Sequence, residues 1–183
     1  PMAALLTTIS TRSNTLRNST NASATVSGSL TSLNRAITLV PNHLAARLAR
    51  SGLLMQKGNL QRAELDVGFI LAQIPRGPRA KYLKSIISAL KGDKKDAESR
   101  IGDVVATLKS VPPDVMRTNP SYLYLAGITS FQLGSYDVAK SYLNKYLQVV
   151  PNDLESIRTL ATIELIGGKP ENARGILAKV NVV

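Results

Sequence analysis

The sequence predicts an all-α fold, namely an α-solenoid of stacked antiparallel helix pairs, on three observations. Four glycines are each followed five residues later by an alanine, in the pairs Gly58/Ala63, Gly92/Ala97, Gly134/Ala139 and Gly168/Ala173. Prolines keep a related spacing, since Pro41 and Pro75 lie 34 residues apart. Residues that favour helix starts follow three of the four glycines, and these are Asn59, Asp93 and Ser135.

Each repeated residue has a physical role in a helical hairpin. Glycine adopts the left-handed conformation that ends a helix without steric cost. The Asn, Asp and Ser side chains can accept hydrogen bonds from the free amides of the next helix. Alanine lets two helices approach closely, and proline stops the second helix. A pair of short helices that repeats about every 34 residues cannot bury its apolar face alone and must stack on its neighbours.

The N-terminal residues 1–28 are rich in Ser, Thr and Asn and contain no acidic residue. Ser and Thr compete with the backbone for hydrogen bonds, so this segment is either a degenerate helix or a flexible linker. The apolar spacing before Pro41 predicts a helix over residues 29–40, the second helix of a partial unit that ends at residue 41.

The unit from Pro120 to Pro151 resembles the tetratricopeptide repeat (TPR) family. Residues 122–127 correspond to the first helix, residues 132–136 to the turn, and Ala139, Leu143 and residues 146–147 to the second helix. The resemblance covers most of the chain, with units at about 42–75, 76–113, 120–151 and 152–183. It implies a right-handed superhelix that binds peptides or proteins on a concave groove lined by the first helices.

Two units depart from the family pattern. Arg47 and Arg50 stand where apolar residues are usual, so the first helix of unit 42–75 is either rotated by about one residue or exposed on that side. In unit 76–113 the terminal proline comes late, and residues 109–120 contain three prolines, which predicts a longer connection.

A longer period is also present, because Pro41-Asn42 and Pro151-Asn152 lie 110 residues apart. In this the chain resembles the TPR-repeat lipoproteins of bacterial exopolysaccharide and exosortase (PEP-CTERM) systems. That resemblance implies a bacterial periplasmic or outer-membrane-associated protein. The last unit ends without a polar capping helix, so we expect it to fray, to pair with a second copy, or to continue into further repeats.

The sequence offers no constellation for catalysis. It has no cysteine and a single histidine, His43, beside a predicted helix start. Its glycines occur singly at turns rather than grouped in a phosphate-binding loop. No stretch approaches 18 consecutive apolar residues, so no membrane span is predicted. We therefore predict a protein that is not an enzyme and that has no catalytic residues, cofactor or metal.

The net charge of +11 is unevenly distributed. Residues 1–109 hold 16 Lys and Arg against 6 acids, whereas residues 110–183 hold 7 against 6. The densest basic patch contains Arg76, Arg79, Lys81 and Lys84. Such a patch is either a solvated face or a site for a polyanion such as an acidic polysaccharide, anionic lipid or nucleic acid. Nucleic acid is disfavoured, because aromatic residues do not interleave with the patch.

Two hypotheses about function follow. The first is a non-enzymatic scaffold that binds a protein or peptide in its groove. The predicted groove residues are Leu48, Met55, Tyr82, Ile86, Tyr124, Ile128, Phe131 and Arg158. Ser121 and Leu125 stand where a carboxylate-binding TPR cochaperone would have basic residues, which argues against a chaperone-tail receptor. The alternative is a polyanion-binding module on the basic face of residues 76–95.

Overall fold

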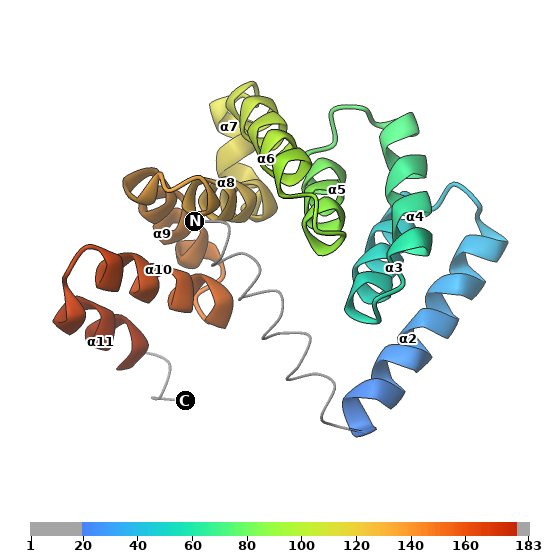
Figure 1. Ribbon diagram of the computed structural model, residues 1–183, viewed down its shortest axis with the longest axis horizontal. Helices are drawn as coiled ribbons and strands as arrows, with labels where there is room; N and C mark the ends of the chain where they lie inside the picture. Colours follow the sequence, from blue (N-terminus) through green and yellow to red (C-terminus); the bar gives the residue numbers. More distant parts are fainter. Residues whose placement is uncertain (1–19, 179–183) are drawn as a thin grey trace. The chain divides into compact units, whose positions relative to one another are not determined.

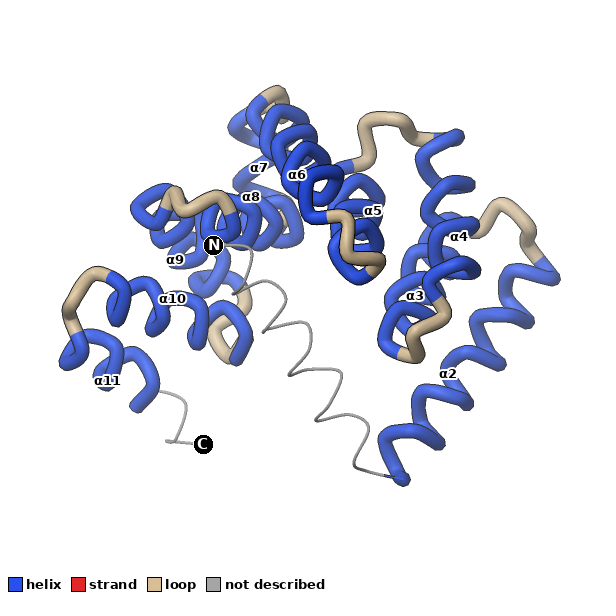
Figure 2. The backbone as a smooth tube through the Cα atoms, viewed as in Figure 1, coloured by secondary structure: helices blue, strands red, loops and turns tan. Residues whose placement is uncertain are grey.

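The structure, a computed structural model, describes residues 20–178. Every regular element in this range is a helix (Figures 1 and 2). In chain order the helices are α2 (Thr20–Leu39), α3 (Leu44–Gln56), α4 (Leu60–Gln73), α5 (Pro78–Leu90), α6 (Lys94–Lys109), α7 (Pro113–Thr118), α8 (Pro120–Gln132), α9 (Tyr136–Val149), α10 (Leu154–Ile166) and α11 (Pro170–Ala178). The all-α fold class predicted from the sequence is confirmed.

The four repeat glycines end helices as predicted. In the described chain a positive φ occurs only at Gly58, Gly92, Gly134 and Gly168. The amide after each of them donates to the carbonyl five residues before it. These four bonds are Asn59 N to Leu54 O at 2.9 Å, Asp93 N to Ser88 O at 3.0 Å, Ser135 N to Ser130 O at 2.9 Å and Lys169 N to Glu164 O at 2.9 Å. One turn geometry is thus repeated four times, because glycine alone adopts it without strain.

The expected helix caps are present at two of three positions. Asn59 accepts from the Arg62 amide at 3.3 Å, and Asp93 accepts from the Asp96 amide at 3.0 Å. Ser135 makes no such bond, so its side chain leaves the start of α9 uncapped. A cap that the sequence did not predict lies at the start of α3, where His43 Nδ1 accepts a hydrogen bond from the Ala46 amide at 3.3 Å.

The N-terminal helix is longer than the sequence indicated. Helix α2 starts at Thr20 and so includes part of the Ser- and Thr-rich segment. Hydroxyl groups within it donate to backbone carbonyls one turn earlier, Thr31 to Ser27 and Ser32 to Gly28, each at 3.1 Å. These bonds satisfy the side chains that otherwise compete with helical geometry. Residues 1–19 lie outside the described part.

Residues 109–120 were predicted as a connection, but a short helix, α7, lies within them. Pro113 occupies its first turn, where a missing amide costs nothing, and Asp114 is in the same turn. Met116 is only 9% exposed, so α7 is anchored by an apolar side chain. In this stretch prolines start a helix rather than only breaking one.

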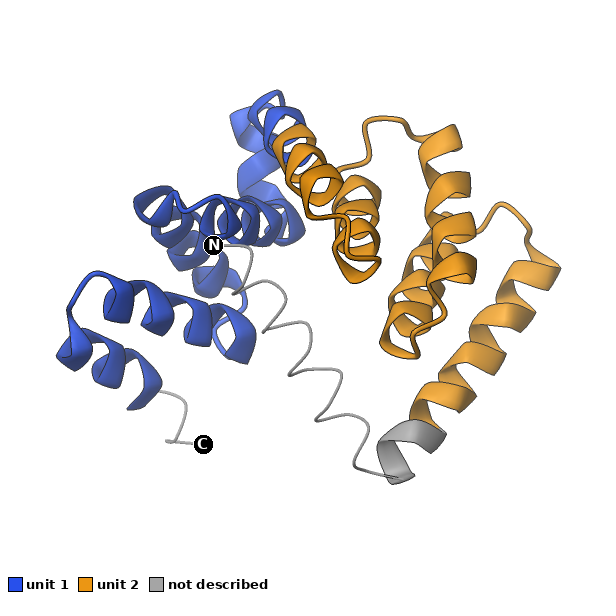
Figure 3. Ribbon diagram, in the orientation of Figure 1, with its two compact units in different colours: residues 1, 104–183 blue, residues 2–103 orange. Residues whose placement is uncertain are grey.

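The chain forms two compact units (Figure 3). We call residues 20–103 the N-terminal unit and residues 104–178 the C-terminal unit, and helix α6 spans the boundary. In the N-terminal unit α3 packs on α2, α4 and α5, and α4 also packs on α5. In the C-terminal unit α8 packs on α7, α9 and α10, and α10 also packs on α9 and α11. In both units each hairpin therefore packs on a neighbouring element, as expected in a repeat protein.

Small residues mark the closest helix contacts. Ala63, Ala97 and Ala139 are completely buried and Ala173 is 3% exposed, which confirms the role predicted for alanine. In the N-terminal unit Leu54, Ala63, Val67 and Ile87 form a core cluster. In the C-terminal unit a Cβ atom on Gly127 would lie 2.6 Å from Leu143 Cδ2, so α8 and α9 touch at that glycine.

Candidate functional site

The arginines that depart from the repeat pattern hold a buried acid. Asp66 on α4 is 1% exposed. Arg50 donates to it from Nε and from a terminal amino group, each at 2.7 Å, and Arg47 donates at 3.0 Å. Arg47 and Arg50 are only 16% and 15% exposed. The sequence left open whether α3 is exposed on the side of Arg47 and Arg50. It is not exposed there, because these two side chains are turned towards a buried carboxylate and not towards solvent.

Further contacts bind both arginine side chains. Arg47 donates twice to the Pro41 carbonyl, at 3.0 and 2.8 Å, and its guanidinium lies 3.8 Å from the ring centroid of Phe69. Arg50 also donates to Asn34 on α2 at 2.8 Å. The hydrogen bond to Asp66 raises the pKa of Arg50. The Arg47–Asp66–Arg50 cluster is therefore a structural tie between α2, α3 and α4. The sequence signal for it was the pair of arginines, but their partner was missed.

Four predicted groove residues lie in the N-terminal unit. Leu48, Met55, Tyr82 and Ile86 are all partly exposed, on α3 and α5. Met55 also packs against the core cluster of this unit. Each of these side chains thus has some surface that a partner can reach.

The other four groove residues lie in the C-terminal unit and differ among themselves. Tyr124 and Phe131 on α8 are partly exposed. Tyr124 packs against Tyr146 with ring centroids 5.3 Å apart, and burial, followed by two nearby acids, raises the pKa of Tyr146. Arg158 on α10 is exposed. Ile128 is only 6% exposed, so it is a core residue and does not serve as a groove contact.

The predicted basic patch is divided by helix geometry. Arg76 precedes α5, and Arg79 stands two residues before Lys81, which places it roughly 200° around the helix axis. Both arginines are exposed, whereas Lys81 and Lys84 are partly buried. The four residues therefore do not form one continuous basic face.

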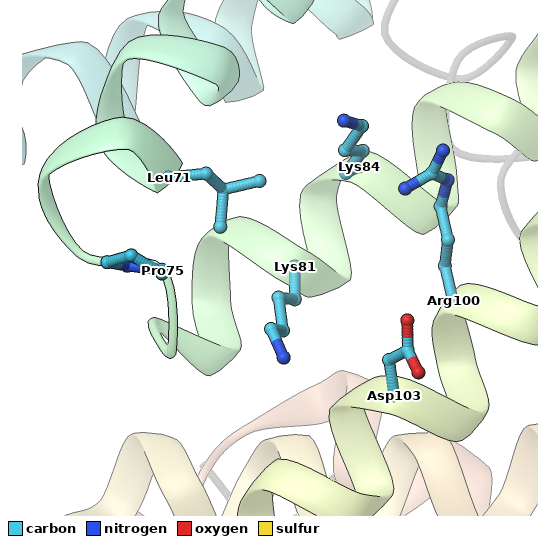
Figure 4. A pocket seen from close by; sticks show the side chains of 6 residues that line it. All are labelled: Leu71, Pro75, Lys81, Lys84, Arg100 and Asp103. Atoms are coloured by element: carbon cyan, nitrogen blue, oxygen red, sulfur yellow. The ribbon is translucent and has the colours of Figure 1, made fainter.

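Lys81 and Lys84 instead line a depression within the N-terminal unit (Figure 4). Its volume is about 240 Å³. The other lining residues are Leu71 and Pro75 from α4 and the following turn, and Arg100 and Asp103 from α6. Sequence reasoning missed Arg100, which lies 16 residues after Lys84 and joins it only when α6 folds back beside α5.

Arg100 is fixed at the edge of this depression by Asp96. Its Nε donates to Asp96 Oδ2 at 2.6 Å, and the Ser88 hydroxyl donates to the same oxygen at 2.5 Å. These two bonds, the Arg100 bond first, lower the pKa of Asp96. The guanidinium is thus held in place by a carboxylate that stays ionised.

The C-terminal unit has a buried acid of its own. Glu164 on α10 is 4% exposed, and it accepts from Lys140 on α9 and from Asn172 on α11, the latter at 3.1 Å. The hydrogen bond to Lys140, followed by that to Asn172, lowers the pKa of Glu164. This site was also missed, because nothing near Glu164 in the sequence marks it as buried.

Two kinds of feature are absent from the described residues. Residues 20–178 contain no group of three or more His, Cys, Asp or Glu side chains placed to hold a metal ion. None of the helices described above has the length and apolar character needed to cross a bilayer.

The helix pairs, the glycine turns and the stacked core define an α-solenoid repeat protein. The fold is that of TPR proteins. A thermophilic TPR protein of Thermus thermophilus superposes with a TM-score of 0.67 at 20% identity, over 87% of this chain and 84% of that one. A chain of the APC/C hetero-tetramer Cut9–Hcn1 gives a TM-score of 0.62 at 17% identity, over 96% and 37% of the two chains.

A third similar structure is that of a protein with a peptide site. YrrB, a TPR protein with an unusual peptide-binding site, gives a TM-score of 0.50 at 18% identity, over 81% of this chain and 72% of that one. No family model and no curated protein matches the sequence. Because the sequence identities are 20% or lower, this structural likeness shows the fold alone.

Proposed function

We propose that this protein is a non-enzymatic scaffold that binds a peptide or protein segment along the first helices of its repeats. The main supporting observation is that Tyr82, Tyr124 and Phe131 are partly exposed on first helices of pairs, α5 and α8. Large aromatic side chains contribute much of the binding energy at protein interfaces. The fold supports the proposal further, because YrrB, which shares it, has a peptide-binding site.

The test is capture of partners by the immobilised chain, with washes at low and high salt. Apolar contacts survive high salt, so the scaffold should retain its partner. Replacing Tyr82, Tyr124 and Phe131 together by Ala should abolish that retention. Tyr142→Ala is the matched control, because Tyr142 lies on α9, a second helix. Equal capture by the triple variant and the wild type would rule out this set of contacts.

A polyanion-binding module on residues 76–95 is the second candidate. It is favoured by the complete absence of acidic residues between Asp66 and Asp93. Capture would then fall steeply with salt and be lost when Arg76, Arg79, Lys81 and Lys84 are changed to Glu. Replacing Tyr82, Tyr124 and Phe131 by Ala would leave this capture of a polyanion unchanged.

The proposed setting is a bacterial envelope assembly for exopolysaccharide or protein export, either periplasmic or associated with the outer membrane. It rests on the 110-residue period and its resemblance alone. Pairing with a second copy through the last unit is also part of this proposal.

A further inference from the structure

The depression between α4, α5 and α6 has the properties of a binding site for one anionic group. Three cations, Lys81, Lys84 and Arg100, line it together with one carboxylate, Asp103. A second carboxylate, Asp96, accepts a hydrogen bond from Arg100 Nε at 2.6 Å. Arg100 is paired with Asp96, whereas the ammonium group of Lys84 forms no ion pair with a carboxylate of the described residues, so the charge of Lys84 is available to a ligand.

The walls favour a particular kind of anion. Leu71 and Pro75 form an apolar side of the depression, opposite the charged groups. An uncompensated single charge suits a carboxylate better than a phosphate, which carries up to two charges. The carboxylate Asp103 in the lining also repels a densely charged chain. An acidic side chain flanked by apolar residues, as in a peptide, matches both walls.

The cationic side is preorganised. Arg100 is held through Nε by Asp96, which itself accepts from Ser88. In Figure 4 the ends of Lys84 and Arg100 lie on the same side of the depression. A guanidinium fixed by a hydrogen bond loses little freedom when it binds a carboxylate, and charge-assisted hydrogen bonds are the strong ones.

We propose that this depression is a subsite for a glutamate or aspartate side chain of a bound peptide. The inference rests on the proposed scaffold function and adds a charge requirement to its partner. The site lies within the N-terminal unit and includes none of the predicted groove residues. Arg76 and Arg79 take no part in it.

The experiment is a titration of the isotope-labelled full chain, followed by amide chemical shifts. The probe is a capped pentapeptide with one Glu between two Leu, and the control probe has Gln in place of Glu. The Glu peptide should give saturable shifts at Lys84, Arg100 and Asp103, and the Gln peptide should not. Lys84→Gln should weaken binding of the Glu peptide by about tenfold or more. Lys95→Gln removes the same charge at an exposed position outside the depression and should have little effect.

Other outcomes would overturn the proposal in different ways. Equal shifts with both peptides, or equal affinity of Lys84→Gln and wild type, would remove the subsite. Equally tight binding of inorganic phosphate would make it a simple ion site. Affinity rising with the length of an acidic oligosaccharide would support the polyanion module instead. Shifts around Tyr124 and Phe131 with both peptides, and none at Lys84, Arg100 and Asp103, would leave the scaffold function standing without this subsite.

Discussion

The two units share one fold but differ in surface chemistry. Residues 20–103 hold 13 Lys and Arg against 6 Asp and Glu, whereas residues 104–178 hold 7 against 6. Six of the eight aromatic residues of the chain lie on α8 and α9, in the C-terminal unit. Basic charge is therefore concentrated in the N-terminal unit, and aromatic side chains are concentrated in the C-terminal unit. A repeat fold fixes the turns and the core and leaves the remaining positions open to different chemistry.

The buried acids illustrate the same difference. Asp66 is held by two arginines that are themselves largely buried, whereas Glu164 is held by an amide and by Lys140, whose side chain is 43% exposed. When its partner is removed, Lys140 can turn to solvent, but Arg47 and Arg50 can do so only in part. The two sites should respond differently to the loss of the carboxylate.

The largest effect is expected from Asp66→Ala. This change leaves two largely buried guanidinium groups without their carboxylate, which should lower the free energy of unfolding by about 3 kcal/mol. Urea unfolding of the variant measures this value. Glu98→Ala, an exposed acid of the same unit, is the control and should change little. Glu164→Gln should cost clearly less than Asp66→Ala, and the reverse order would contradict the comparison.

A smaller loss is expected from overpacking the C-terminal unit. Ala139→Leu adds volume at a completely buried position in α9 and should cost roughly 1–3 kcal/mol. Thermal unfolding shows whether it does. Val138→Leu is a matched control, since Val138 is 48% exposed on the same helix. An unchanged melting temperature in Ala139→Leu would mean that α9 does not approach its neighbours as closely as described.

The glycine turns should behave alike in both units. Gly58 has a φ of 74° and Gly134 a φ of 75°, so Gly58→Ala and Gly134→Ala should each cost about 1 kcal/mol. Gly68→Ala is a control with an effect of opposite sign. Gly68 lies inside α4 with open space around it, so this change should raise the free energy of unfolding by about 0.5 kcal/mol. Chemical unfolding of the three variants tests this. Unequal costs at the two turns would show that the units do not share the turn energetics.

The smallest effect concerns acid stability in the C-terminal unit. The lowered pKa of Glu164 means that its ionised form stabilises the folded state. That contribution is complete above the ordinary Glu value of about 4.3, and it is lost as the pH falls through the lower pKa of the folded state. Unfolding followed between pH 7 and pH 2 should therefore show a shallower acid decline in Glu164→Gln. Parallel curves for variant and wild type would assign the decline to other acids, among them Asp96.

Local features were predictable from the sequence, and pairings across helices were not. The glycine turns, the buried alanines and the caps at Asn59 and Asp93 depend on a few neighbouring residues. Two local predictions were wrong. Ser135 does not cap α9, and a short helix, α7, forms where a connection was expected. At both places the nearby residues are compatible with more than one local conformation. Ile128 was placed in the groove by helical spacing, yet packing buries it.

The sequence by itself determined the helix pairs, their turns and the residues that pack between them, since periodicity and glycine chemistry act over a few residues. Only the tertiary structure decided which charges meet. Asp66 lies 16 residues from Arg50, and Glu164 lies 24 residues from Lys140. Lys84 and Arg100 likewise come from separate helices. Such pairings depend on how helices stack, and stacking is driven by apolar burial, which is not directional and leaves no local mark on the charged residues it brings together.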